Sequence, residues 1–320
     1  MSENSFLPFL KELFATADPS VLVGCGHDDC AHFTANGRRL AVSADAFAEG
    51  SHFLPGTPAE KVAEKALGAS VSDLAASACR ARWALISLCL RPGLEPDWAE
   101  RFARSLKATA LELGVSLVGG DTVSATAGVF VSITVIGEPL PGGPLLRSGA
   151  RPGDILAVTG EFGGSLLGRH LRPRPRLREI SALMEFSASA GKGCFPSAGM
   201  DVSDGLALDL FRLCRESGVG AEIDASAIPL AAEAALARPD LTPLEHALTD
   251  GEDFELLLAL PPELWSAFNA FLSSRDGISV ASGLAKFTAI GRITAVGGIA
   301  LRRLDGGLER LEAKGYEHKW

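Results

Sequence analysis

Residues 40–45 run Leu40-Ala41-Val42-Ser43-Ala44-Asp45, a mostly apolar stretch that ends in an acid. A similar arrangement recurs in Val115–Asp121, where Gly119 and Gly120 precede the acid, and acids also cluster in Asp201-Val202-Ser203-Asp204-Gly205. Short apolar runs of this kind predict buried strands, so each acid is expected near the end of a strand. Carboxylates gathered at buried strand ends repel one another and lose hydration. They therefore either take up protons or hold cations.

A predicted helix carries a further acid on its apolar face. Its start, Thr57-Pro58-Ala59-Glu60, has the form of a capping box with proline at the first helical position. Beyond it, one stripe at helical spacing holds Val62, Ala66, Ala69, Asp73 and Ala76. We expect Asp73 on the buried face, where a charge is costly unless it is paired or bound to a metal.

The aspartates come without histidine or cysteine among them, which suits hard divalent cations such as Mg2+. The glycine-containing turn Gly26-His27-Asp28-Asp29 adds two more acids. Each position also has an ordinary explanation, such as an Asx turn at Asp28 or a helix cap at Asp204. Because one explanation covers all of them, the set predicts a magnesium site for in-line phosphoryl transfer. An acceptor that is already an ionised phosphate needs no general base.

Strand and helix patterns alternate along the first half of the chain and predict an α/β (α+β) protein with two domains. A helix from Trp98 should place Phe102 and Leu106 inward and end at Gly114. The Pro/Gly-rich stretch 139–144 breaks the pattern, so we place one domain at 1–150 and the other at 151–320. Strands are expected at 39–45, 83–90, 115–118, 128–136, 154–159, 253–260, 288–296 and 299–304, with a further strand at Asp201, and helices at 206–216 and 262–274.

Composition limits the possible partners. The formal net charge of -9 argues against a nucleic-acid or membrane surface. The apolar runs are too short to span a bilayer, the N-terminus does not resemble a secretory signal, and the six cysteines form no C-x-x-C pair. We therefore expect a cytoplasmic protein. Because the P-loop and dinucleotide-binding motifs are absent, any phosphate binding should depend on metals held by aspartates.

Short segments along nearly the whole chain, and in the same order, resemble those of the thiamine-monophosphate kinase family, part of the aminoimidazole ribonucleotide synthetase superfamily. Singly they are short, but together and in order they are specific. They are Gly26–Ala31, Ala44–Phe53, Ser72–Ala76, Gly119–Thr122, Arg147–Asp154, Leu171–Pro173, Asp201–Leu206, Gly251–Leu256 and Lys314–His318.

The resemblance implies transfer of a phosphoryl group from ATP to thiamine monophosphate, which gives thiamine diphosphate. It also implies two α/β domains and a homodimer in which the N-terminal domains pair into a β-barrel-like assembly. Carried over by position, it implies Mg2+ ligands at Asp28, Asp29, Ser43, Asp45, Asp73, Asp121, Asp201 and Asp204, of which Asp45, Asp73 and Asp204 are the expected catalytic residues. It implies ATP contacts at Gly120, Arg147 and Ser203, and substrate contacts at His52, Glu252 and Tyr316.

Three positions and one segment depart from the family pattern. The segment is Ala76–Ala81, which lacks a glycine and a proline of the pattern. His27 is inserted before the aspartate pair, which leaves open whether Asp28 or Asp29 is the ligand; the number of metal ions is open as well. Ala44 replaces a threonine, and Asp250 stands where glycine is usual. Two alternatives therefore stay open: another ATP-dependent enzyme of the same superfamily, and a nucleotide-binding scaffold without catalysis.

Overall fold

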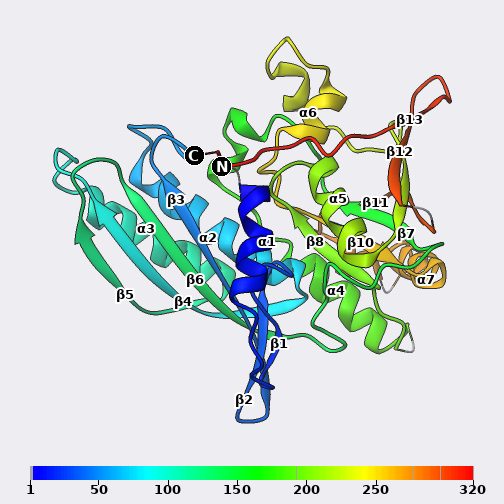
Figure 1. Cartoon of the computed structure of the whole chain (residues 1–320), viewed down its shortest axis with the longest axis horizontal. Coiled ribbons are helices and arrows are strands. Elements are labelled where there is room, and N and C mark those ends of the chain that lie inside the picture. The colour runs from blue at the N-terminus through cyan, green and yellow to red at the C-terminus, as the bar shows by residue number, and fades with distance from the viewer. Residues whose placement is uncertain (1–2, 192, 276, 296, 320) are drawn as a thin grey trace.

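Two mixed β-sheets form the two halves of the molecule (Figure 1). The computed structural model describes residues 3–191, 193–275, 277–295 and 297–319. The first sheet has the order β1-β2-β3-β6-β4-β5, in which β4 and β5 are parallel and the other pairs are antiparallel. Its strands are β1 (Val21–Val23), β2 (Ala31–Ala35), β3 (Arg38–Ala48), β4 (Cys79–Leu90), β5 (Ser116–Ser124) and β6 (Phe130–Pro139).

The second sheet has the order β13-β12-β9-β11-β7-β10-β8, with β9 and β12 parallel. Its strands are β7 (Ile155–Thr159), β8 (Ala198–Val202), β9 (Gly220–Asp224), β10 (Glu255–Leu260), β11 (Phe287–Thr294), β12 (Gly298–Arg302) and β13 (Leu308–Arg310). The first sheet ends at Pro139 and the second begins at Ile155, so the boundary expected near residue 150 lies in the connection. The domain limits 1–150 and 151–320 themselves stay a prediction.

Helices α2 (Ala59–Ala76) and α3 (Trp98–Leu113) pack together, and α2 lies against β3, β4 and β6. We call the face of the first sheet that packs on α2 the inner face, represented by Ala41, Ala84 and Ile133, all fully buried. The outer face is the opposite one and carries Leu85, which is 38% exposed. One face of the sheet therefore lacks a cover among the described residues.

The two predicted helix starts had different outcomes. In α3 the apolar stripe is buried at Trp98, Phe102 and Leu106, and Gly114 ends the helix in the left-handed conformation, as predicted. The capping box at Thr57 was wrong. Pro58 has extended dihedral angles and is itself the N-cap, so α2 begins at Ala59 without a side-chain cap.

The remaining helices surround the second sheet or lie between the two halves. They are α1 (Glu3–Leu13), α4 (Leu177–Ala188), α5 (Leu206–Ser217), α6 (Pro243–Thr249), α7 (Pro262–Leu272) and α8 (Gly277–Ala281), with 3-10 turns η1 (Ser165–Leu167), η2 (Arg169–Leu171) and η3 (Ala232–Leu236). Helix α1 lies in the middle of the view, and Lys11 on it forms an ion pair with Glu216 of α5 at 3.1 Å (Figure 1). None of the helices in the described ranges combines the length and apolarity needed to cross a membrane.

Two acids that were predicted at strand ends lie inside strands. Strand β3 continues past Asp45 to Ala48, and β5 continues past Asp121 to Ser124. In both places the strand can continue because successive side chains point to opposite faces, so an acid can face a cavity or solvent without ending the strand. Strands β1, β2, β9 and β13 and helices α1, α6 and α8 were not predicted.

Candidate active site

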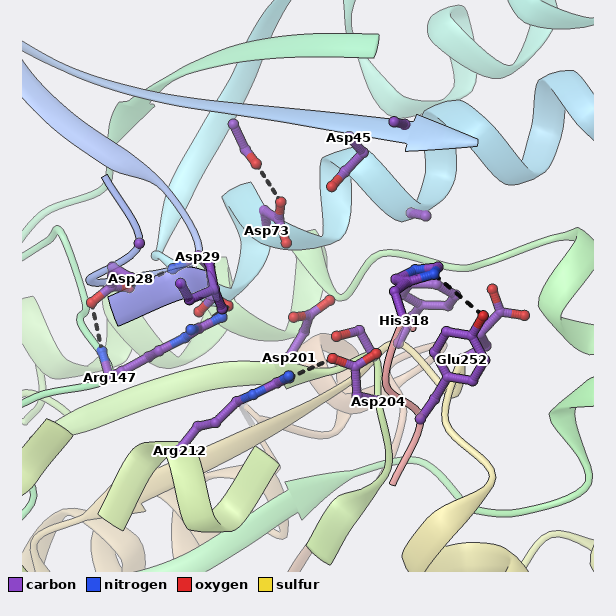
Figure 2. A pocket seen from close by; sticks show the side chains of 18 of the residues that line it. Asp28, Asp29, Asp45, Asp73, Arg147, Asp201, Asp204, Arg212, Glu252 and His318 are labelled. Carbon is purple, nitrogen blue, oxygen red and sulfur yellow. Dashed lines mark hydrogen bonds and ion pairs between the residues drawn. The ribbon is translucent and has the colours of Figure 1, made fainter. Parts of the chain in front are cut away.

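A cavity of about 680 Å³ lies between the two halves of the molecule. Its walls come from β3 and α2 on one side, from β8 and α5 on the other, and from α1 and the C-terminal segment (Figure 2). Twelve of the residues expected to act in function line it: Asp28, Asp29, Ser43, Asp45, His52, Asp73, Arg147, Asp201, Ser203, Asp204, Glu252 and Tyr316. Side chains from distant parts of the sequence thus meet in one place, while their individual roles stay predictions.

Strand β3 aims its polar side chains at α2. Ser43 and Asp45 are two residues apart, so both lie on the inner face of the sheet. The Ser43 hydroxyl donates to Asp73 Oδ2 at 2.5 Å. Burial raises the pKa of Asp45, and the nearby charge of Asp29 adds to this effect.

Helix α2 also reaches strand β8 in the second sheet. The Ser72 hydroxyl donates to Asp201 Oδ2 at 2.5 Å, and both residues are buried. Because Ser72 and Asp73 are neighbours on the helix, one turn of α2 touches carboxylates from both halves of the molecule. This turn fixes the relative position of Asp73 and Asp201.

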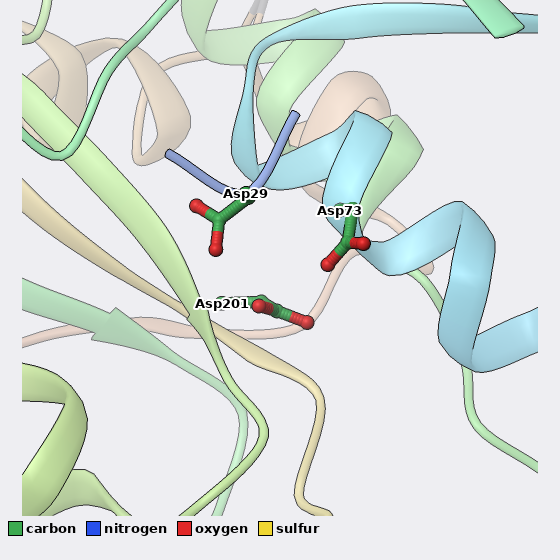
Figure 3. A group of neighbouring side chains, drawn as sticks. All are labelled: Asp29, Asp73 and Asp201. Atoms are coloured by element: carbon green, nitrogen blue, oxygen red, sulfur yellow. The ribbon is translucent and has the colours of Figure 1, made fainter. Parts of the chain in front are cut away.

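Three carboxylates converge at the inner end of the cavity (Figure 3). One oxygen from each of Asp29, Asp73 and Asp201 lies within 4.8 Å of the others. Burial raises the pKa of Asp73 well above its usual value, and the charges of Asp45 and Asp201 add to this effect. Burial, together with the Asp29 charge, likewise raises the pKa of Asp201. A cation would relieve both the desolvation and the repulsion.

The two aspartates after His27 have different environments. Both carboxylate oxygens of Asp28 accept hydrogen bonds from the backbone. Oδ1 accepts from the Asp29 N–H at 3.0 Å, and Oδ2 accepts from the Arg147 N–H at 2.9 Å. Asp29 faces the convergence point. Its Oδ1 accepts from the Arg147 guanidinium, whereas its buried Oδ2 has no hydrogen-bond partner among the described residues. A buried carboxylate oxygen without a partner is costly unless a ligand completes it.

Arginines border the acidic end. Arg147 forms an ion pair with Asp29, and Arg212 on α5 contacts Asp204 at 2.5 Å and Asp209 at 2.7 Å. Asp209 also accepts from the backbone N–H of Ser203 and of Asp204, which fixes the turn before α5. Figure 2 shows Arg147 beside Asp28 and Asp29, and Arg212 reaching Asp204.

The other end of the cavity is aromatic. The rings of His52 and His318 lie 5.1 Å apart, and Tyr316 packs edge-on against His318 at 4.8 Å between ring centroids. Burial, with a contribution from His318, lowers the pKa of His52 to about 4, and its Nδ1 accepts from the Ala48 N–H. His52 is therefore neutral near pH 7 and carries its proton on Nε2. Figure 2 shows His318 and Glu252 together, away from Asp28 and Asp29.

Gly120 and Asp121 lie outside the cavity. Paired positions run from Asp45 to Ile133, from Ile133 to Ile86 and from Ile86 to Gly120, so Gly120 is three strands away, about 14 Å at 4.8 Å per strand. Asp121 is the next residue and lies on the outer face. A side chain at Gly120 would meet the Ile86 carbonyl oxygen at 1.8 Å, so glycine is needed there for strand packing. Within one chain these residues do not join the carboxylates.

The sequence interpretation missed several residues of the site. Lys11, Arg212 and His318 line the cavity, and Lys65 lies behind it, bonded to Glu252. Lys65 could have been identified from the sequence, because, like Asp73, it is a charged residue in the alanine-rich helix α2. Arg212 is spaced three residues from Asp209 on α5, which is the spacing of a helical ion pair.

Comparison with known proteins agrees with this geometry. The profile of the AIR synthase related protein N-terminal domain matches residues 27–138, and that of the C-terminal domain matches residues 151–303. Thiamine-monophosphate kinase of Rhodopirellula baltica is 33% identical, over 99% of this chain and 97% of its own length. The Escherichia coli K12 protein of that name is 34% identical, over 93% of this chain and 92% of its own.

A solved structure is similar over the same extent. The complex described as AaThiL with AMPPCP and TMP matches with a TM-score of 0.81 and 29% identity, over 99% of this chain and 97% of that one. The predicted two-domain α/β fold is thereby confirmed. With relatives above 30% identity over most of both chains, and with both domain profiles matched, this chain belongs to the thiamine-monophosphate kinase family of AIR synthase related proteins.

Proposed function

We propose that this chain transfers a phosphoryl group from ATP to thiamine monophosphate and forms thiamine diphosphate and ADP. The observation that carries the proposal is the convergence of Asp29, Asp73 and Asp201 in a cavity whose other end is aromatic. Relatives with the matching name, and a neighbour complexed with AMPPCP and TMP, support the choice of substrates.

The acidic end fits Mg2+. Its donors are oxygens alone, as hard cations prefer, and in the part of the chain that the structure describes the buried Asp29 Oδ2 has no hydrogen-bond partner. We assign Asp29 rather than Asp28 to the metal, because the backbone already uses both oxygens of Asp28. The other proposed ligands are Asp45, Asp73, Asp201 and Asp204. Bound there, Mg2+ would offset negative charge on the phosphate oxygens.

The protein side chains orient the two substrates. Arg147 and Ser203 are proposed to bind ATP phosphates beside the carboxylates, and His52, Glu252 and Tyr316 to hold the rings of thiamine monophosphate at the aromatic end. Leu7 and Pro8 of α1 line the cavity, so this helix limits the entry of water. The acceptor phosphate is ionised, and the residues need only align it and stabilise charge.

We also propose a homodimer that forms through the outer face of the first sheet. Strand β5 is an edge strand with Val118 55% and Val123 52% exposed, and Leu85 on β4 and Phe130 on β6 are exposed as well. An edge strand next to exposed apolar side chains is typical of an interaction surface. Gly120 would then contact ATP, and Asp121 would bind metal, at this interface, as the sequence predicts. The expected cytoplasmic location stays a prediction.

The test is formation of thiamine diphosphate from thiamine monophosphate, ATP and Mg2+. We expect product with the wild type, none with a chelator, and a loss of roughly 100-fold or more in kcat with Asp45→Asn. Asp97→Asn is the matched control, because Asp97 has a 62% exposed side chain at the start of α3, away from the cavity. It should retain full activity.

Other results would favour the alternatives. ATP binding without turnover of thiamine monophosphate, but with turnover of another phosphate or acyl acceptor, would indicate a different enzyme of the superfamily. ATP binding without turnover of any acceptor would indicate a scaffold. Equal activity in Asp45→Asn and the wild type would contradict the assigned site.

A further inference from the structure

A lysine buried behind the aromatic end of the cavity has no role in the mechanism so far. Lys65 lies on α2, and its side chain is only 1% exposed. Its Nζ donates to Glu252 Oε1 at 2.5 Å, and the Glu252 side chain is 23% exposed and lines the cavity. Lys65 does not line the cavity itself. Its only hydrogen bond to a cavity-lining residue, among the described residues, is the one to Glu252.

The burial of Lys65 requires its partner. A buried ammonium group is strongly unfavourable unless an opposite charge compensates it. Burial lowers the pKa of Lys65, and the charge and hydrogen bond of Glu252 oppose that change. The Lys65 charge also reaches the aromatic end, where it adds to the effects of burial and His318 that lower the pKa of His52.

The backbone that carries Glu252 is held in an unusual conformation. Glu252 has φ 55° and Phe254 has φ 53°, both in the left-handed region that non-glycine residues rarely adopt. The Glu252 N–H donates to the Ser203 carbonyl at 2.7 Å, and the Phe254 N–H donates to the Val202 carbonyl at 2.8 Å. The loop is thus fixed beside Ser203, and Lys65 fixes the side chain.

We propose that Lys65 is a positioning residue for substrate recognition, which holds the Glu252 carboxylate as the polar acceptor at the aromatic end of the cavity. This inference rests on the proposed function. Thiamine monophosphate offers groups that such an acceptor fits, namely a cationic thiazolium ring and an amino group on its pyrimidine. The rings of His52, Tyr316 and His318 would stack against the rings of thiamine monophosphate, and Glu252 would orient the bound substrate.

The experiment compares two affinities in Lys65→Met. We expect the Kd of thiamine monophosphate, measured by calorimetry without ATP, to rise roughly tenfold or more, because a charge-assisted hydrogen bond no longer fixes Glu252. The Kd of AMPPCP with Mg2+ should stay within about twofold, because the acidic end is unchanged. In the Glu252→Gln background, Lys65→Met should raise the Kd of thiamine monophosphate little further. With Glu252 intact, Lys65→Arg should bind thiamine monophosphate more tightly than Lys65→Met does.

A matched control lies one helical turn away. Lys61 on α2 pairs with Glu64 at 2.8 Å but has a 41% exposed side chain, so Lys61→Met should change neither affinity. If Lys65→Met does not fold, Lys65→Gln, which keeps a donor without the charge, carries the same expectation. The proposal would be overturned if Lys65→Met weakened the binding of both ligands equally, or if it caused a further full loss of thiamine monophosphate affinity in the Glu252→Gln background. Lys65 would then have only a structural role.

Turnover separates this inference from the proposed function. A wild type that binds thiamine monophosphate without phosphorylating it would refute the proposed function, while the role of Lys65 would still be decided by the two affinities. A wild type that does not bind thiamine monophosphate would refute both.

Discussion

At the scale of single residues, the contacts of Asp250 account for an acid at a position where the family usually has glycine. Its carboxylate contacts His246 Nδ1 at 2.8 Å, and His246 Nε2 lies 2.9 Å from the Arg238 carbonyl oxygen. Both ring nitrogens face acceptors, so the charged imidazolium fits best. Burial opposes that charge, but the hydrogen bonds that the ring donates to Asp250 and to the Arg238 carbonyl, together with the Asp250 charge, outweigh burial and raise the pKa of His246. Asp250 is thus engaged with α6 and is not a free acid beside Glu252.

This pair predicts a pH-dependent contribution to stability. A histidine with a raised pKa in the folded state stabilises fully below its unfolded pKa of about 6.5 and loses this contribution as pH rises through the folded pKa. Urea unfolding should show His246→Gln about 1–3 kcal/mol less stable than the wild type at pH 6. The difference should shrink by pH 9. The exposed His27→Gln is the control, and a difference independent of pH would contradict the prediction.

At the scale of elements, α2 joins the core to the site. It is buried on nearly all sides and carries Lys65, Ser72 and Asp73. Leu74 on the same helix is fully buried, so Leu74→Ala should lower the free energy of unfolding by about 2–5 kcal/mol through the cavity it leaves. Leu111→Ala on α3, where the residue is 82% exposed, should change it by less than about 0.5 kcal/mol. Denaturant unfolding measures both, and equal losses would contradict the packing.

The same scale shows what the sequence could predict. Periodicity identified the buried face of α3 and placed Asp73 on α2, because a helix repeats over several turns and averages out exceptions. It failed at Asp45 and Asp121, which lie inside strands. A strand face depends on the parity of single residues, and the register shift between Ala84 and Leu85 against β5 changes that parity. Short strands such as β2, with five residues, give too few residues for a pattern.

At the scale of the whole molecule, the outer face of the first sheet predicts a dimer. The chain mass is 33.4 kDa, so light scattering should give about twice that value for the wild type. Val123→Lys replaces an apolar side chain on this face with a long charged one and should shift the protein to monomer, because desolvating a charge in an interface is unfavourable. Leu111→Lys, on an exposed position of α3, should leave the dimer intact.

Activity then tests whether Asp121 works at that interface. We expect Asp121→Asn to remain dimeric but to lose thiamine diphosphate formation, and Val123→Lys to lose both together. The reason is geometric: in one chain Asp121 lies on the sheet face opposite to Asp45, so only a neighbour packed on the outer face can bring a ligand to it. A wild type that is monomeric and fully active, or an Asp121→Asn variant with normal turnover, would show instead that Asp121 serves only as a solvated residue of the edge strand.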